Sequence, residues 1–291
     1  MTKRLALGTA QFGMPYGIAN TQGKVQSKSA ERILQYASES GIDTIDTAIA
    51  YGESESLLGS IGVSPFKVIS KLPALPSSTS GVCDWALRST EASLSRLKKD
   101  SLDGLLLHRS ADLLGAKGVG LFEAMCQLKS RGLVKKIGIS VYSYEILDLC
   151  VGRYQLDLVQ APFNLVDRRF HASGWLQRLA SLGCEVHVRS AFLQGLLLLP
   201  REQIPAKFER WSEIWNRWHG WLQQRGEPVS ACLSFPMSFP QIDRIVVGVN
   251  DLAQLRQIVG ASQSCNRHDL PDLACDEESL INPAKWPGLW G

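Results

Sequence analysis

A repeated alternation of short apolar runs and helix-period segments is the feature that most constrains this chain. About eight β-rich runs occur, each followed by a polar turn and a segment of helical periodicity. The expected strands are Arg4–Leu7, Thr44–Asp46, Val68–Lys71, Leu102–His108, Lys136–Ser140, Leu158–Gln160, Glu185–Arg189 and Ile245–Gly248. Most are continuous Val, Ile and Leu runs, which is typical of parallel strands covered on both faces. The expected helices include Ser27–Ser40, Trp85–Lys98, Leu121–Arg131, Tyr144–Arg153, Gly174–Leu182 and Leu252–Ala261.

Strand–helix alternation along the whole chain predicts parallel βαβ units. Eight such strands, in a chain of 291 residues, favour an α/β fold of the (β/α)8 TIM-barrel type, which typically needs about 250 residues. The alternative is an open doubly wound sheet, which would carry GxGxxG after its first strand. The turn there reads Gly8-Thr9-Ala10-Gln11-Phe12-Gly13. We therefore expect one barrel domain over residues 1–291.

Two segments extend beyond the repeating pattern. A helical insertion spans residues 196–224, and a C-terminal tail spans residues 262–291, which we expect near the barrel mouth. Within the insertion, a predicted helix from Ala206 to Gln224 places four tryptophans on one face: Trp211, Trp215, Trp218 and Trp221. Packing on the barrel wall is the main interpretation, and an aromatic surface facing substrate or partner is the alternative. Trp286 and Trp290 of the tail are candidates to reach the mouth.

The composition limits the kinds of binding partner and the cellular compartment that we expect for this protein. The formal net charge is +3, too small an excess to mark a surface for nucleic acid or an anionic membrane. No apolar run approaches the roughly 18–20 residues that span a bilayer. Because Gly8, Gln11 and Gly13 interrupt the apolar residues after the basic start, we expect no secretory signal. The seven cysteines are widely spaced without a CxxC pair, so we expect reduced thiols, no structural metal site and a cytoplasmic protein.

Ionisable residues gather where the expected strands end. The second strand ends at Asp46, the third at Lys71 and the fourth at His108, and Tyr51 lies five residues after Asp46. In a (β/α)8 barrel the catalytic groups lie at these ends. A tyrosine with a pKa near 10 is a weak acid at neutral pH, and a nearby lysine ammonium lowers that pKa. The set therefore predicts a site that donates a proton to a developing alkoxide, with a histidine that either orients a carbonyl oxygen or passes a proton.

Each of these residues also has a purely structural interpretation. Asp46 is a possible helix N-cap, Lys71 a solvated strand-end charge, His108 a histidine of the barrel rim and Tyr51 a packed loop aromatic. The joint pattern of three consecutive strand ends and a loop tyrosine favours the catalytic interpretation.

Several ordered segments resemble the aldo-keto reductase superfamily. They are residues 7–13 (LGTAQFG), 45–52 (IDTAIAYG), 70–71 (SK), 106–108 (LLH), 137–140 (IGIS), 160–164 (QAPFN) and 192–197 (FLQGLL). The resemblance covers roughly residues 4–262. It implies a (β/α)8 barrel that reduces an aldehyde or ketone to an alcohol with NADPH or NADH. It also implies that Tyr51 is the general acid, that Lys71 and Asp46 tune it, and that His108 orients the carbonyl.

The same resemblance implies a set of cofactor-binding residues. Ser140, Gln160 and Asn164 would hold the nicotinamide carboxamide, with Gly8, Thr9 and Asp46 close by. Arg189 falls where many members stack an aromatic ring on the nicotinamide, and a planar guanidinium is able to stack there instead. The remaining members follow the last two strands: Ser190, Phe192, Leu193, Gly195, Gly248, Asn250 and Gln254.

The choice between NADPH and NADH stays open at this level. The loop that in NADPH-preferring members carries Arg or Lys for the 2′-phosphate reads Gly248-Val249-Asn250-Asp251-Leu252-Ala253-Gln254 here. Two other functions also remain: a nucleotide-binding barrel that acts as a sensor or auxiliary subunit, and a lyase that forms a Schiff base on Lys71. Arg168-Arg169 is either a solvated pair or a contact for an anionic group. We expect a small carbonyl substrate and a monomer or small homo-oligomer.

Overall fold

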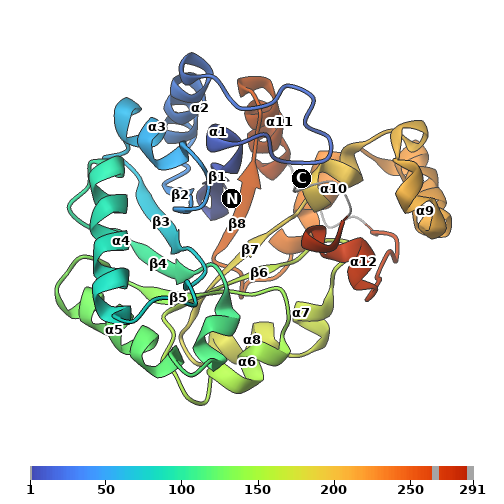
Figure 1. The fold of residues 1–291 in the computed structure, drawn as a ribbon. Helices are drawn as coiled ribbons and strands as arrows, with labels where there is room; N and C mark the ends of the chain where they lie inside the picture. Colours follow the sequence, from blue (N-terminus) through green and yellow to red (C-terminus); the bar gives the residue numbers. More distant parts are fainter. Residues whose placement is uncertain (1, 264–268, 287–291) are drawn as a thin grey trace.

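Eight parallel strands close into a barrel surrounded by helices. The computed structural model describes residues 2–263 and 269–286. The strands are β1 (Leu5–Gly8), β2 (Thr44–Asp46), β3 (Lys67–Leu72), β4 (Gly104–Leu107), β5 (Ile137–Ser140), β6 (Leu158–Pro162), β7 (Glu185–Arg189) and β8 (Arg244–Gly248). Each strand pairs with the next, and β1 pairs with β8 to close the ring. The predicted (β/α)8 barrel is confirmed (Figure 1).

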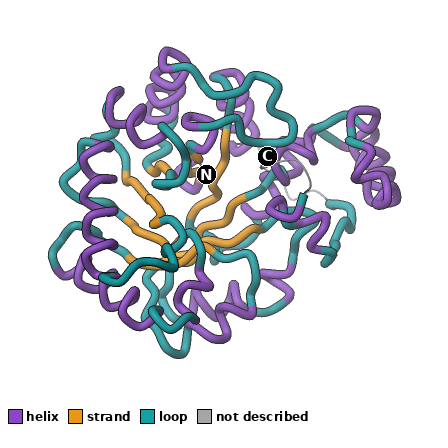
Figure 2. Tube along the Cα trace, viewed as in Figure 1, coloured by secondary structure: helices purple, strands orange, loops and turns teal. Residues whose placement is uncertain are grey.

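The helices cover the outside of the strand ring, as Figure 2 shows in purple around orange. The α-helices are α1 (Ala10–Gly13), α2 (Ser27–Glu39), α3 (Ser54–Ile61), α4 (Val82–Leu97), α5 (Gly118–Ser130), α6 (Glu145–Cys150), α7 (Arg169–Ala172), α8 (Trp175–Ser181), α9 (Ser212–Arg225), α10 (Pro228–Met237), α11 (Leu252–Gln263) and α12 (Glu278–Ile281). Short 3-10 turns are η1 (Thr2–Arg4), η2 (Ser110–Leu114), η3 (Leu193–Leu198), η4 (Arg201–Gln203), η5 (Ala206–Trp211) and η6 (Pro283–Lys285). None of the helices in residues 2–263 and 269–286 has the length and hydropathy of a membrane span.

The barrel interior is filled by side chains from alternate strand positions. Ile69, Leu106 and Leu158 form an apolar cluster separate from the main core. A side chain at Gly104 would meet Ile69 Cδ1 at 2.8 Å, so glycine leaves room for this cluster. Strand side chains two positions apart share a face. The inward position above Ile69 is therefore occupied by Lys71.

The tryptophan-rich insertion forms its own packed unit. The predicted single helix over Ala206–Gln224 is wrong at its start, because Trp211 leaves helical geometry (φ −104°, ψ 30°) between η5 and α9. Trp215 and Trp218 are fully buried and donate their indole N–H to Phe208 O and Leu197 O, both within the insertion. These two tryptophans thus pack chiefly against the insertion itself, and α9 lies at the periphery of the molecule (Figure 1).

The tail runs from the insertion to the loop after β6. Trp221 donates its indole N–H to Asp269 O, and Cys275 N donates to Val166 O. Trp286 is buried against Phe208, with ring centroids 4.8 Å apart. This ties Trp286 to the insertion. Trp290 lies outside the described residues, and α11 continues to Gln263, just past the predicted start of the tail.

Candidate active site

The ends of β2 and β3 place a buried ion pair at the carboxyl end of the barrel. Lys71 Nζ donates to Asp46 Oδ1 at 2.7 Å and to Thr47 O at 2.9 Å. The Lys71 side chain is 1% exposed and that of Asp46 is 5% exposed. A charge this deeply buried needs a partner, so the solvated interpretation of Lys71 is wrong. The Asp46 carboxylate accepts the hydrogen bond from Lys71 and does not cap a helix.

Tyr51 and His108 complete the cluster. Lys71 Nζ lies 5.2 Å from the centroid of the Tyr51 ring. The Tyr51 and His108 rings meet edge to face, with centroids 5.6 Å apart. Three consecutive strands and the loop after β2 therefore bring together all four residues predicted to be catalytic.

Two glycines fix the backbone that carries Tyr51. A Cβ on Gly13, the last residue of α1, would lie 1.7 Å from Tyr51 O. Gly52 has a φ of +53°, and a Cβ there would lie 2.5 Å from Gly13 O. The end of α1 and the Tyr51 loop thus pack backbone to backbone, at a distance that only glycine permits.

Burial dominates the protonation of this cluster. It raises the pKa of Tyr51 well above 10, with the Asp46 charge adding to the effect. The expected lowering of the Tyr51 pKa by Lys71 is not seen, because the ammonium is compensated by Asp46 and the phenol is desolvated. Burial, followed by the charges of Lys71 and Arg189, lowers the pKa of His108 to about 4. At neutral pH Tyr51 is therefore protonated and His108 is neutral.

A second layer supports the ion pair from inside the barrel. Gln160 Nε2 donates to Asp46 Oδ2 at 2.7 Å, and Ser140 Oγ donates to Gln160 Oε1 at 3.3 Å. Asn164 Oδ1 accepts from two backbone amides, and its Nδ2 donates to Ser190 O at 3.0 Å. Leu193 is fully buried. None of these four predicted cofactor residues lines the adjacent cavity.

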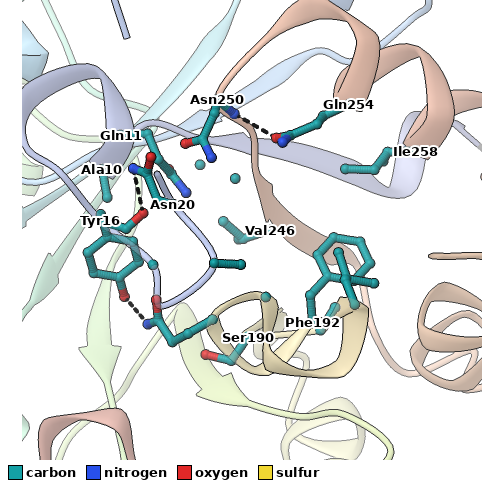
Figure 3. A pocket seen from close by; sticks show the side chains of 18 of the residues that line it. Ala10, Gln11, Tyr16, Asn20, Ser190, Phe192, Val246, Asn250, Gln254 and Ile258 are labelled. Atoms are coloured by element: carbon teal, nitrogen blue, oxygen red, sulfur yellow. Dashed lines mark hydrogen bonds between the residues drawn. The ribbon is translucent and has the colours of Figure 1, made fainter. Parts of the chain in front are cut away.

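A cavity of about 320 Å³ opens beside Tyr51. The predicted residues that line it are Gly8, Thr9, Asp46, Tyr51, Arg189, Ser190, Phe192, Gly195, Gly248, Asn250 and Gln254. Lys71 and His108 are not among the residues that line this cavity. Figure 3 shows Tyr16 and Asn20 on one side, Asn250 and Gln254 on another, and Ser190 with Phe192 below.

Several residues that line the cavity were not predicted from the sequence. The loop between α1 and α2 contributes Tyr16, Gly17, Ala19 and Asn20, and Gln11, Gln194, Val246, Gln257 and Ile258 are further members. The one sequence feature that could have indicated them is their position after a strand, because the loops that follow barrel strands shape the mouth. No periodicity marks which of their side chains face inward.

The loop after β7 closes one side of the cavity in strained backbone. Ser190, Leu193 and Gln194 have φ values of 63°, 46° and 59°, a region that costs roughly 1–2 kcal/mol for each residue other than glycine. Gln194 O accepts from Ile18 N at 3.1 Å, and Gln194 Nε2 donates to Tyr16 Oη at 2.5 Å. These bonds join the loops after β1 and β7 at the cavity wall.

The closed ring of parallel strands defines a TIM barrel. The buried Asp–Lys pair, the tyrosine and the histidine lie at the carboxyl ends of its strands and form a candidate catalytic site at its mouth. Residues 4–268 match the model of the aldo/keto reductase family, and the chain belongs to that family.

Curated relatives and solved structures agree with this assignment. The chain is 28% identical over 185 residues to the aldo-keto reductase YhdN of Bacillus subtilis, a match covering 58% of this chain and 53% of YhdN. It is 34% identical over 126 residues to an aldo-keto reductase of Mycolicibacterium paratuberculosis, covering 43% of each. The matches thus span about half the length of these relatives. Pyridoxal 4-dehydrogenase of Microbacterium luteolum is 23% identical, with 88% of each chain covered.

Two solved structures show the same fold. A holo-form aldo-keto reductase of Bacillus halodurans superposes with a TM-score of 0.73 at 19% identity, covering 90% of this chain and 87% of that one. A putative aldo-keto reductase of Pseudomonas aeruginosa gives a TM-score of 0.67 at 21% identity, with 90% of each chain covered.

Proposed function

We propose that this protein reduces an aldehyde or ketone to an alcohol with NADPH or NADH, and that Tyr51 supplies the proton. The observation that carries the proposal is the convergence of Tyr51 with the Asp46–Lys71 pair and His108 beside one cavity. When bound, the reduced nicotinamide supplies the hydride. The protein places the carbonyl and stabilises the charge that develops on its oxygen.

Each residue of the cluster has a distinct part in the proton transfer. Tyr51 is held protonated by its raised pKa, so it is able to donate from Oη to a developing alkoxide. The Lys71 ammonium, fixed by Asp46 at 2.7 Å, stabilises the phenolate that remains. His108, neutral because its pKa is lowered to about 4, offers an N–H to orient the carbonyl oxygen.

The cavity residues suit a dinucleotide. Asn250 Oδ1 is buried without a hydrogen-bond partner among the described residues, so a ligand hydroxyl is able to satisfy it. A Cβ on Gly248 would meet the Gln11 amide at 2.6 Å, so glycine at this position lets the Gln11 amide lie in the cavity wall, where it is able to bind a polar group of the cofactor. We propose that the lining residues Gly8, Thr9, Ser190, Phe192, Gly195, Gly248, Asn250 and Gln254 hold the cofactor, with Ser140, Gln160, Asn164 and Leu193 supporting them from behind.

The charges of the lining favour NADH. A 2′-phosphate binds most strongly to placed cations. Among the described lining residues the cation is Arg189, and the wall around β8 offers the amides of Gln11, Asn250, Gln254 and Gln257 instead. We therefore propose that NADH binds at least as tightly as NADPH.

Binding and turnover test the proposal in sequence. The purified protein is titrated with NADPH and with NADH while its tryptophan fluorescence is followed, and a panel of aldehydes and ketones is then assayed at 340 nm. Quenching by one or both cofactors and oxidation with a carbonyl are expected. No response to either cofactor by folded protein would refute the cofactor assignment.

The two alternative functions have different signatures. A sensor would bind the dinucleotide without turnover. A Schiff-base lyase needs a free amine that its substrate reaches, whereas Lys71 is paired with Asp46 and lies outside the cavity lining. Trapping of Lys71 by borohydride in the presence of substrate would support the lyase. A small carbonyl substrate, a monomer or small homo-oligomer and a cytoplasmic location remain part of our proposal.

A further inference from the structure

The first two residues of α3, Ser54 and Glu55, are polar, buried and outside the proposed proton transfer. Ser54 is 0% exposed and Glu55 is 1% exposed. They follow the loop that carries Tyr51, and Ser54 N donates to Tyr51 O at 3.0 Å. Because α3 begins where this loop ends, the contacts that fix Ser54 and Glu55 also fix the loop that carries the phenol.

The Glu55 carboxylate joins α3 to one strand and one helix. Its Oε1 accepts from Ser70 Oγ of β3 and from Ser93 Oγ of α4, each at 2.6 Å. Its Oε2 accepts from Arg96 Nε at 2.9 Å and from Arg96 Nη2 at 2.6 Å. Both oxygens are therefore hydrogen-bonded, and the start of α3 is tied to β3 and to α4 through one side chain.

The contact with β3 is made beside the lysine of the cluster. Successive side chains of a strand point to opposite faces, so Lys71 points into the barrel and Ser70 points outward to Glu55. The Tyr51 loop is also bound to this strand near its start, where Ile49 N donates to Lys71 O at 3.2 Å. The loop is thus held to the strand that carries the ammonium at both of its ends.

Ser54 fixes the same point from the side of the ion pair. Its Oγ donates to Thr9 O at 2.9 Å and lies 3.2 Å from Thr47 Oγ1. Thr47 O in turn accepts from Lys71 Nζ at 2.9 Å. The end of the Tyr51 loop is therefore anchored to the residue that holds the ammonium, as well as to the outer face of β3.

Stability alone gives no reason for a carboxylate at position 55. A buried ion pair is commonly no more stabilising than apolar side chains of similar volume, because both charges must be desolvated. The helices α3 and α4 already pack closely without it, since a Cβ on Gly59 would lie 1.9 Å from Arg96 O. The directional hydrogen bonds of Glu55 add a defined position of α3 along β3.

We propose that Glu55 is a positioning residue for the proton transfer: through Ser70 it holds the start of α3 against β3 and so keeps the Tyr51 phenol at the Lys71 ammonium. The inference rests on the proposed function, because it takes Tyr51 as the proton donor. Lys71 Nζ lies 5.2 Å from the centroid of the Tyr51 ring. A misplacement of about 1 Å costs about 100-fold in rate, so loosening this contact should lower kcat.

Ser70→Ala and Ser93→Ala are a matched pair that separates positioning from stability. Both hydroxyls are fully buried and donate to the same Glu55 oxygen at 2.6 Å, so each variant should lower Tm by a similar amount, roughly 2–6 °C. Only Ser70 lies on the strand that carries Lys71. Ser70→Ala should therefore lower kcat about 10- to 100-fold with little change in KM, whereas Ser93→Ala should keep the wild-type kcat.

Two further measurements show how Ser70 acts. Glu55→Gln removes the charge and keeps the size of the side chain, and it should lower kcat. Ser70→Ala should lower kcat little further in the Glu55→Gln background, because both changes weaken one contact. Ser70→Ala should also raise the solvent deuterium isotope effect on kcat, since proton transfer becomes slower. Quenching by NADH should be unchanged in all these variants, because none of the three residues lines the cavity.

An NMR signal of Tyr51 gives a readout that needs no turnover. With a carbon label at tyrosine Cζ, the Tyr51 resonance, assigned with Tyr51→Phe, should move in Ser70→Ala and stay in place in Ser93→Ala. An unmoved resonance in Ser70→Ala, or an equal loss of kcat in both serine variants, would overturn the inference and leave the reductase assignment intact. A moved resonance in a folded protein that reduces no carbonyl would refute the reductase assignment alone.

Discussion

Replacing Gly13 with alanine would push Tyr51 away from Lys71 and His108. The new Cβ would lie 1.7 Å from Tyr51 O, whereas real Cβ contacts essentially never fall below 3.0 Å. The loop that carries Tyr51 must therefore retreat by about 1.3 Å. A misplacement of about 1 Å costs about 100-fold in rate, so we expect kcat to fall about 100-fold. Crowding of this kind destabilises by roughly 1–3 kcal/mol, which lowers Tm by roughly 2–12 °C.

Steady-state reduction of a carbonyl, tryptophan quenching by NADH and a thermal melt measure the three consequences of Gly13→Ala. Gly120→Ala is the matched control, because a Cβ on Gly120 in α5 has nothing within 4 Å. It should keep wild-type kcat and gain about 0.5–1 kcal/mol. Wild-type kcat in Gly13→Ala would refute the argument that the backbone contact positions Tyr51.

Three further predictions follow from the same structure. Asp46→Asn leaves the Lys71 ammonium buried without a counter-charge and should cost about 3–5 kcal/mol in urea unfolding, a loss that Asp46→Asn/Lys71→Met should reduce. The pKa of His108 is about 4 in the folded protein and near 6.5 in the unfolded chain. Between pH 6.5 and pH 4 the His108 imidazole is therefore protonated in the unfolded state alone, which favours unfolding. Stability should thus fall by about 3 kcal/mol as pH drops from 6.5 to 4, and His108→Gln should remove that part of the slope. Lys98→Gly should stabilise by about 1 kcal/mol in the same assay, since exposed Lys98 ends α4 with a φ of 53°.

The barrel was readable from the sequence because buried parallel strands leave a strong signal. β2 and β7 have the predicted bounds, β5 and β8 differ from them by one residue at one end, and β1 is shifted by one residue. The meeting of Asp46, Lys71 and His108 followed from the same signal, since residues that end adjacent strands of a closed sheet lie side by side.

What the sequence did not reveal depends on packing between distant segments. The pKa of Tyr51 is set by how much water surrounds the phenol, which no local pattern encodes. Tyr16 and Asn20 reach the cavity because Gln194 bonds to the loop that carries them. The burial of Trp215 and Trp218 within the insertion likewise reflects contacts that helical periodicity cannot distinguish from contacts with the barrel wall.

The role of Tyr51 is the central claim, and Tyr51→Phe tests it most directly. This variant removes the hydroxyl and keeps the ring that packs against His108 at 5.6 Å. NADH quenching should be unchanged, while kcat for a carbonyl that wild type reduces should fall about 100- to 10,000-fold, the usual contribution of a general acid. Wild-type turnover by Tyr51→Phe, measured at 340 nm, would contradict the account.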